Sequence, residues 1–251
     1  MERRELGQTG LTVSRLCFGT GTNGWSHRSN QGDLGIDRLA RLLAFAHELG
    51  ITFWDTADQY GTHPHVAAAL RGVDRDSVTI ATKTVSKSSS EVTADVERFC
   101  QELGTPHLDI VLLHCMSEAN WPQTMSGAME ALSQCKERGQ VRAVGVSCHG
   151  LGALQTAASC PWVDVGLVRV NYAGESMCGS PPQVVPLVEE MASGGKGVYG
   201  MKVMGGGGDL TRDPGRAIAY AGGVEGLHAL SIGMMSEVEI TQNAEALASL
   251  P

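Results

Sequence analysis

The segment ITFWDTADQYG, residues 51–61, sets the pattern on which the fold prediction rests: an apolar run ends in an aspartate and opens into a polar turn. Similar runs recur along the chain, each followed by turn residues and then by a longer stretch of helical periodicity. The predicted strands are Arg15–Thr20, Ile51–Asp55, Ser77–Lys83, Leu108–His114, Val141–Ser147, Val163–Asn171, Gly197–Lys202 and His228–Gly233. The predicted helices lie near residues 36–49, 62–71, 91–103, 122–138, 149–158, 183–193, 213–221 and 236–249.

Strict alternation of strands and helices predicts a parallel sheet with right-handed crossovers. Such a sheet can close into a barrel or stay open and doubly wound. Two features favour a (β/α)8, or TIM, barrel: the strand count is eight, and no G-x-G-x-x-G turn follows the first strand. Arg3–Leu6 and Leu11–Ser14 flank a glycine-containing turn and predict a β-hairpin on the barrel floor. We expect one domain over residues 1–251, with the hairpin in 1–14 and the barrel in 15–251.

The composition narrows the class of protein. A formal net charge of −8 argues against nucleic acid or anionic lipid as partners. Seven cysteines, an odd number without C-x-x-C spacing, are expected to be reduced thiols, and no metal site is expected. No apolar leader follows Met1 and no run of about 18 apolar residues occurs, which predicts a cytoplasmic protein without a membrane span. We expect a monomer or a small homo-oligomer.

Three consecutive predicted strands end in polar side chains. Asp55 ends the second strand, Lys83 the third and His114 the fourth, and Tyr60 lies in the turn after Asp55. Parallel strands are otherwise nearly continuous apolar runs, so packing alone does not explain charged groups at three neighbouring strand ends. Active sites of (β/α)8 barrels form at the C-terminal ends of the strands. We therefore expect these four side chains to share one site.

The four groups together suit proton transfer. A tyrosine has an ordinary pKa near 10, and the ammonium of Lys83 is expected to lower the pKa of Tyr60 by stabilising its phenolate. Asp55 would keep Lys83 charged, and His114 would orient a substrate oxygen toward Tyr60. Such a site can protonate a carbonyl oxygen that becomes an alkoxide. It has no hydride source of its own, so a cofactor is implied.

The ordered set of motifs resembles the aldo-keto reductase family. The motifs are Asp55–Gly61, Ala81–Lys83 and Leu112–His114, together with Leu6–Ser14, Gly139–Ser147, and Ile232–Ser236 followed by Asn243. The resemblance runs from about residue 3 to 245 and implies hydride transfer between NAD(P)H and an aldehyde, ketone or sugar. In that reaction Tyr60 would be the general acid or base, Lys83 and Asp55 would tune it, and His114 would orient the carbonyl.

The resemblance also implies cofactor contacts. Ser147 would bind the carboxamide, and the other matching positions are Gly19, Thr20 and Gly21 beside the cofactor and Gly233, Met234, Ser236 and Asn243 along its adenosine half. Further cofactor contacts are expected from Cys148, Asn171, Met201, Lys202 and Glu239.

Some of these positions depart from the family pattern. Cys148 stands where asparagine is common, Leu167 stands where strand six often has glutamine, and no aromatic residue follows strand seven. Glu239 stands where many members have an arginine that binds the 2′-phosphate of NADP, so this phosphate would meet repulsion. Both dinucleotides stay open, NADP favoured by the family and NAD by Glu239.

Other residues near the predicted strand ends attract attention. Trp25 and Trp121 lie on loops after strands and are expected to line the substrate pocket together with Tyr60 and His114. His63 and His65 flank Pro64 and are expected at the surface, because their i, i+2 spacing suits metal ligation poorly.

Two alternative functions stay open. Lys83 could form a Schiff base, as in a lyase, although a lysine held protonated by Asp55 is a poor nucleophile. The chain could also be a regulatory barrel that binds the cofactor without turnover. That alternative draws on the missing aromatic residue after strand seven and on the absence of the long C-terminal loop that many family members have.

Overall fold

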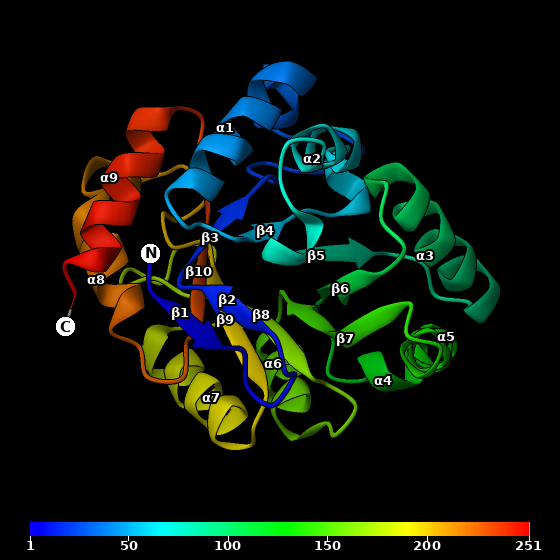
Figure 1. The fold of residues 1–251 in the computed structure, drawn as a ribbon. Coiled ribbons are helices and arrows are strands. Elements are labelled where there is room, and N and C mark those ends of the chain that lie inside the picture. The colour runs from blue at the N-terminus through cyan, green and yellow to red at the C-terminus, as the bar shows by residue number, and fades with distance from the viewer. Residues whose placement is uncertain (251) are drawn as a thin grey trace.

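The computed structural model describes residues 1–250 and contains a closed barrel of eight parallel strands. The order around the barrel is β10-β3-β4-β5-β6-β7-β8-β9, so each strand lies beside its neighbour in sequence and the last strand pairs with the first (Figure 1). The strands are β3 (Leu16–Gly19), β4 (Phe53–Asp55), β5 (Thr79–Thr84), β6 (Leu108–Met116), β7 (Val141–Cys148), β8 (Val165–Arg169), β9 (Gly197–Met201) and β10 (Ala229–Gly233). The prediction of a TIM barrel with an N-terminal hairpin is confirmed.

Helices surround the barrel close to the predicted ranges (Figure 1). They are α1 (Ile36–Glu48), α2 (His63–Leu70), α3 (Ser89–Leu103), α4 (Trp121–Thr124), α5 (Ser126–Glu137), α6 (Leu151–Ser159), α7 (Pro181–Ser193), α8 (Pro214–Gly222) and α9 (Glu237–Ala248). The prediction of one helix over residues 122–138 is wrong. The backbone leaves the helical region at Met125, with φ −111° and ψ 15°, and the Met125 side chain is buried. Within residues 1–250, none of the helices has the length and hydrophobicity needed to cross a bilayer.

The N-terminal hairpin closes one end of the barrel. It pairs β1 (Arg3–Glu5) with β2 (Thr12–Ser14) in antiparallel register (Figure 1). Leu6, Leu11 and Val13 are buried in the same apolar cluster as the residues that fill the barrel interior. Because this hairpin covers the floor, the C-terminal ends of the strands form the open end of the barrel.

The strand register carries polar side chains toward that open end. Asp55 on β4 pairs with Ala81 on β5, and Lys83 on β5 pairs with Leu112 on β6. Ala81 and Leu112 belong to the interior cluster. Since alternate residues of a strand point the same way, Lys83 and His114 are directed inward, each one step further along its strand.

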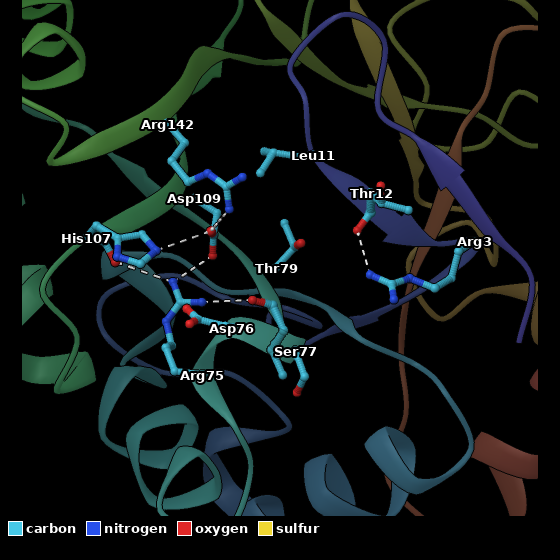
Figure 2. A pocket seen from close by; sticks show the side chains of 11 residues that line it. Arg3, Leu11, Thr12, Arg75, Asp76, Ser77, Thr79, His107, Asp109 and Arg142 are labelled. Carbon is cyan, nitrogen blue, oxygen red and sulfur yellow. Dashed lines mark hydrogen bonds and ion pairs between the residues drawn. The ribbon is translucent and has the colours of Figure 1, made fainter.

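The floor of the barrel has a polar cavity of about 190 Å³ built around Asp109 (Figure 2). The Asp109 carboxylate is 1% exposed and accepts hydrogen bonds from Arg75 at 2.7 Å, Arg142 at 3.2 Å and the backbone N–H of Ile80 at 2.9 Å. A buried charge with this many partners ties β5, β6 and β7 together at their N-terminal ends.

The Asp109→Ala variant should lower the free energy of unfolding by about 3 kcal/mol, because it leaves the part-buried charge of Arg75 without its carboxylate. Urea denaturation measures this change. Asp76 also lines the floor cavity but is exposed and forms no ion pair within residues 1–250, so Asp76→Ala is a matched control. That control should change stability by no more than about 0.5 kcal/mol. Equal, small effects of both substitutions would contradict a structural role for Asp109.

Candidate active site

The open end of the barrel contains a cavity of about 610 Å³, and Asp55, Tyr60 and His114 line it. Asp55 ends β4, and Tyr60 lies in the 3-10 turn η2 (Asp58–Tyr60) that follows. Lys83 on β5 is fully buried beside them, and His114 lies near the end of β6. The structure therefore brings together the four side chains that the strand ends predict.

Lys83 and Asp55 form a buried ion pair. Lys83 Nζ donates to Asp55 Oδ1 at 2.7 Å and to the backbone oxygen of Thr56 at 2.7 Å. The other carboxylate oxygen, Asp55 Oδ2, accepts a hydrogen bond from the Tyr199 hydroxyl at 2.8 Å. Burial acts to lower the pKa of Lys83, but Asp55, Tyr60 and Cys17 act together in the opposite direction, and the pKa is raised above its ordinary value. Lys83 is therefore an ammonium at neutral pH.

Tyr60 lies between Lys83 and His114. Lys83 Nζ is 4.8 Å from the centre of the Tyr60 ring, and the Tyr60 hydroxyl is 3.5 Å from His114 Nε2. Burial raises the pKa of Tyr60 to about 12, while the Lys83 ammonium acts in the opposite direction. The expected net lowering of this pKa is wrong, because the desolvation of the phenolate outweighs its attraction to Lys83.

Two glycines make room for the Tyr60 ring. A Cβ atom at Gly21 would lie 2.2 Å from Tyr60 Cε2, and one at Gly24 would lie 2.3 Å from Tyr60 Cδ1. The turn that carries Tyr60 is also fixed from outside, because Arg98 on α3 donates to Asp58 Oδ1 at 2.7 Å. The position of the phenol is thus set by the loop after β3 and by α3 as well as by its own turn.

His114 is a neutral imidazole held at an irregular point of β6. Burial lowers the pKa of His114 well below its ordinary value, and the charge of Lys83 adds to this. The register of β6 against β7 shifts between Leu113 and Met116, and Cys115 has a φ of +65°. The backbone N–H of Cys115 donates to Ser147 Oγ at 2.8 Å. A bulge of this kind at a strand end re-aims the adjacent side chain.

The expected cofactor positions divide into two groups. Those that line the cavity are Gly19, Gly21, Met201, Lys202, Gly233, Glu239 and Asn243. Those that lie outside its wall are Thr20, Ser147, Cys148, Asn171, Met234 and Ser236. Most of the second group have partners within the protein: Thr20 Oγ1 donates to the Asp55 backbone oxygen at 3.0 Å, and Ser236 Oγ caps α9.

Asn171 illustrates why a polar residue at a strand end is not always a ligand contact. Its Nδ2 donates to the backbone oxygens of Glu175 at 2.7 Å and Lys202 at 3.0 Å. Its Oδ1 accepts the backbone N–H groups of Ala173 and Glu175, each at 3.1 Å. All four hydrogen bonds of the amide hold the loop after β8 in place, and Asn171 does not line the cavity.

Of the two tryptophans expected in the substrate pocket, the structure places Trp25 at the cavity and Trp121 elsewhere. Trp25 is 53% exposed, lines the cavity and lies 6.0 Å from His114, ring centre to ring centre. Trp121 is 2% exposed and its indole N–H donates to the backbone oxygen of Ala153 at 3.3 Å, between helices. The structure therefore does not place Trp121 at the site.

The expectation that His63 and His65 lie at the surface is wrong, since they are 2% and 9% exposed. His63 shares hydrogen bonds with Glu102 at 2.6 Å and Thr82 at 2.8 Å. Asp58, His63 and Glu102 have ligand atoms within 4.8 Å of one another. Arg98 bridges Asp58 and Glu102, so the guanidinium already supplies the positive charge of this cluster.

Three residues of the site were not singled out in the sequence. Tyr199 bonds Asp55 from a position 144 residues away, and Arg169 and His149 line the cavity. Arg169 ends β8 and His149 follows β7, so the strand-end rule that found Lys83 could have found both. Tyr199 lies in the middle of β9, and only the closed barrel brings it to Asp55.

The cavity fits a nicotinamide dinucleotide in size and charge. Its volume of about 610 Å³ lies within the range of small-molecule sites, roughly 300–1,000 Å³. Lys202, Gly206 and Gly207 lie on one wall, and the positive φ of these glycines, 90° and 106°, brings backbone close to the cavity. Cations and open backbone of this kind suit phosphate groups.

Comparisons with known proteins agree with this geometry. A family model described as "Aldo/keto reductase family" matches residues 15–248. L-galactose dehydrogenase from Arabidopsis thaliana is 28% identical over 158 residues, which cover 59% of this chain and 48% of that protein. A probable aldo-keto reductase 1 from Glycine max is 26% identical over 217 residues, covering 79% and 61%. The chain thus matches about half to three fifths of the length of these relatives.

Solved structures give the same result. A putative aldo-keto reductase from Pseudomonas aeruginosa superposes with a TM-score of 0.80 at 26% identity, over 98% of this chain and 95% of that one. An aldo-keto reductase from Bacillus halodurans in its holo form also has a TM-score of 0.80, over 100% and 92% of the two chains. Its identity is 20%, so that likeness shows the fold alone.

Replacing Lys83 tests whether the buried pair serves stability. Lys83→Met should lower the free energy of unfolding by about 3 kcal/mol, because Asp55 is left as a buried carboxylate without its cation. The double variant Lys83→Met/Asp55→Asn should recover most of that loss, because a neutral pair costs little desolvation. Urea unfolding of both variants measures this. A double variant no more stable than Lys83→Met would show that the ion pair itself holds the barrel together.

Proposed function

We propose that this chain, which belongs to the aldo/keto reductase family, interconverts a carbonyl group of an aldehyde, ketone or sugar and the corresponding alcohol. Members of the family are generally NAD(P)-dependent oxidoreductases. A nicotinamide cofactor, when bound, supplies or accepts the hydride. The residues of this chain bind the reactants, orient them and move the proton.

One observation carries the proposal: the Tyr60 phenol lies between a buried ammonium and a neutral imidazole. Its hydroxyl is 3.5 Å from His114 Nε2, and Lys83 Nζ is 4.8 Å from its ring centre. A carbonyl oxygen placed beside both Tyr60 and His114 could accept a hydrogen bond from each. As negative charge develops on that oxygen, Tyr60 gives it a proton, and the phenolate that results is stabilised by Lys83.

The protonation states favour reduction. Because the pKa of Tyr60 is about 12, its phenol is protonated throughout the physiological range and is ready to donate. Oxidation of an alcohol requires the phenolate, which is the minor form below that pKa. His114, kept neutral by burial, has one N–H to offer to the substrate and adds no charge that would repel Lys83.

The Schiff-base alternative is disfavoured by the surroundings of Lys83. Its nitrogen is fully buried, donates two hydrogen bonds at 2.7 Å, and has a raised pKa. A nucleophilic lysine needs a free, neutral amine that the substrate can reach. Neither condition holds for this side chain.

The Tyr60→Phe variant tests the proposal directly. It should lower kcat/KM for carbonyl reduction by at least about 100-fold, since the proton donor is lost, while the Kd of NAD(P)H changes little. Cofactor consumption at 340 nm over aldehydes, ketones and sugars gives the rates, and fluorescence titration gives the Kd. Tyr220→Phe, on the outer helix α8, is a matched control that should retain the wild-type rate. Turnover that survives Tyr60→Phe would remove the mechanism, and wild-type protein that binds the cofactor but turns over none of these carbonyls would favour the regulatory barrel.

Glu239 bears on the choice of cofactor. Its carboxylate lies on the cavity wall in the first turn of α9 and accepts the backbone N–H of Met235 at 2.9 Å. This negative charge occupies the helix N-terminus that could otherwise receive the 2′-phosphate of NADP, so we propose that NAD binds more readily.

Removing that charge should improve the binding of NADP alone. Glu239→Gln is expected to tighten the Kd of NADP relative to NAD about fivefold, corresponding to roughly 1 kcal/mol of relieved repulsion. Glu237→Gln removes a charge from the same helical turn, away from the cavity wall, and should leave the ratio unchanged. Calorimetric titration of both dinucleotides measures it. An unchanged ratio in Glu239→Gln would show that Glu239 does not face the phosphate position.

A further inference from the structure

Two cations on the cavity wall, Arg169 and Lys202, form no ion pair with a carboxylate of residues 1–250. Arg169 ends β8, its backbone pairs in register with Met201 on β9, and Lys202 follows directly, so the two residues lie on neighbouring strand ends. Within residues 1–250, the ion pairs at 4.0 Å or less include neither Arg169 nor Lys202. Two neighbouring cations in a partly enclosed cavity repel each other and favour an anionic ligand.

The Arg169 guanidinium has spare donors. One of its N–H groups donates to His149 Nδ1 at 2.6 Å, and its Nε is buried without a partner in the described chain. A guanidinium carries five N–H donors, and buried donors are normally satisfied. A ligand in the cavity cannot reach the buried Nε, but three of the four N–H groups on the two Nη atoms have no partner in the described chain and can bind it.

His149 positions Arg169 without neutralising it. Because a guanidinium can only donate, His149 Nδ1 is the acceptor and the imidazole proton lies on Nε2, which is 3.6 Å from Cys115 Sγ. Burial lowers the pKa of His149 to about 3, and the charge of Arg169 adds to this. His149 is thus neutral and leaves the full charge of Arg169 facing the cavity.

Arg169 lies on the side of the cavity that holds the proton donor. It donates to His149, whose ring centre is 6.3 Å from that of His114, and His114 contacts Tyr60. Lys202 lies instead beside the glycines of the cavity wall, Gly206 and Gly207, since a Cβ at Gly206 would lie 3.2 Å from Lys202 Nζ. Lys202 is therefore the cation beside the expected phosphates.

We propose that Arg169 binds a carboxylate on the substrate, so that the carbonyl compound reduced by this protein is an acid, such as an aldehyde or ketone that also bears a carboxylate. The inference rests on the proposed carbonyl reduction. Arg169 recognises the carboxylate through two parallel N–H donors, which adds direction as well as charge. A neutral substrate would displace water from the guanidinium without supplying a carboxylate in its place. The cost of this desolvation disfavours the binding of neutral analogues.

The test compares substrates that differ only in the carboxylate. 4-Formylbenzoate is paired with its methyl ester, and succinic semialdehyde with butanal, and kcat/KM is measured for each with saturating cofactor. Wild type should favour the carboxylated member of each pair. In Arg169→Met the ratio of carboxylated to neutral kcat/KM should fall by about 10- to 100-fold, the loss expected for a charged hydrogen-bonded pair.

Two other variants separate the sources of an effect. Arg41→Met removes an equal charge from the exposed face of α1 and should leave the ratio unchanged. Lys202→Met should weaken the Kd of NAD(P)H more than it changes the ratio. If Arg169→Met weakens cofactor binding and leaves the substrate ratio intact, Arg169 serves the dinucleotide and the proposal is overturned. An equal loss for carboxylated and neutral aldehydes would also overturn it, since that is the result of a purely structural role.

A binding measurement keeps the inference testable if the proposed function fails. Absence of turnover with every carbonyl would count against reduction, not against the anion site. Calorimetric titration of terephthalate, a dicarboxylate that cannot be reduced, should then give a Kd at least about tenfold weaker in Arg169→Met than in wild type. Equal Kd values, or no binding to either protein, would overturn the carboxylate site itself.

Discussion

A lysine ammonium enclosed in the barrel is the feature on which the site depends. Lys83 is fully buried, and its charge persists because Asp55 and the backbone oxygen of Thr56 accept hydrogen bonds from it, while the Tyr199 hydroxyl donates to the other carboxylate oxygen. A buried ion pair is rarely more stabilising than a well-packed apolar pair. In our proposal the charge is kept for the neighbouring Tyr60, because a nearby cation stabilises the phenolate of this residue.

Cationic side chains lie at both ends of the barrel but have different surroundings there. At the floor, Arg75 and Arg142 are paired with Asp109, and the cavity beside them is small and lined in part by the hairpin. At the open end, Arg169 and Lys202 line a cavity about three times as large, 610 Å³ against 190 Å³, and neither forms an ion pair within residues 1–250. The presence or absence of an ion pair distinguishes the structural cations from those available to a ligand. Residue type alone does not make this distinction.

Much of the fold follows from local sequence, and part of the site does not. Strand and helix periodicities are enough to predict the barrel, because each of its strands pairs with its neighbour in sequence. Asp55, Lys83 and His114 can be predicted to share a site without long-range information, because each lies at or near the C-terminal end of a strand. Tyr199 and the neutral form of His149 depend on contacts between distant segments. The raised pKa of Tyr60 depends on how deeply the phenol is buried, and no spacing reveals that. The burial of Trp121 between helices is likewise a contact between distant segments, since its indole N–H donates to the backbone oxygen of Ala153.

The central claim is that Lys83 stays protonated to support proton delivery by Tyr60 while the cofactor delivers hydride to a carbonyl carbon. The most direct measurement is mass spectrometry of the alcohol formed with NADH or NADPH in which both hydrogens at nicotinamide C4 are deuterium. One deuterium on the carbinol carbon is the predicted result, and borohydride added to a separate incubation of protein and carbonyl compound should leave the protein mass unchanged. An alcohol without deuterium, or a substrate adduct on Lys83 trapped by borohydride, would contradict the account.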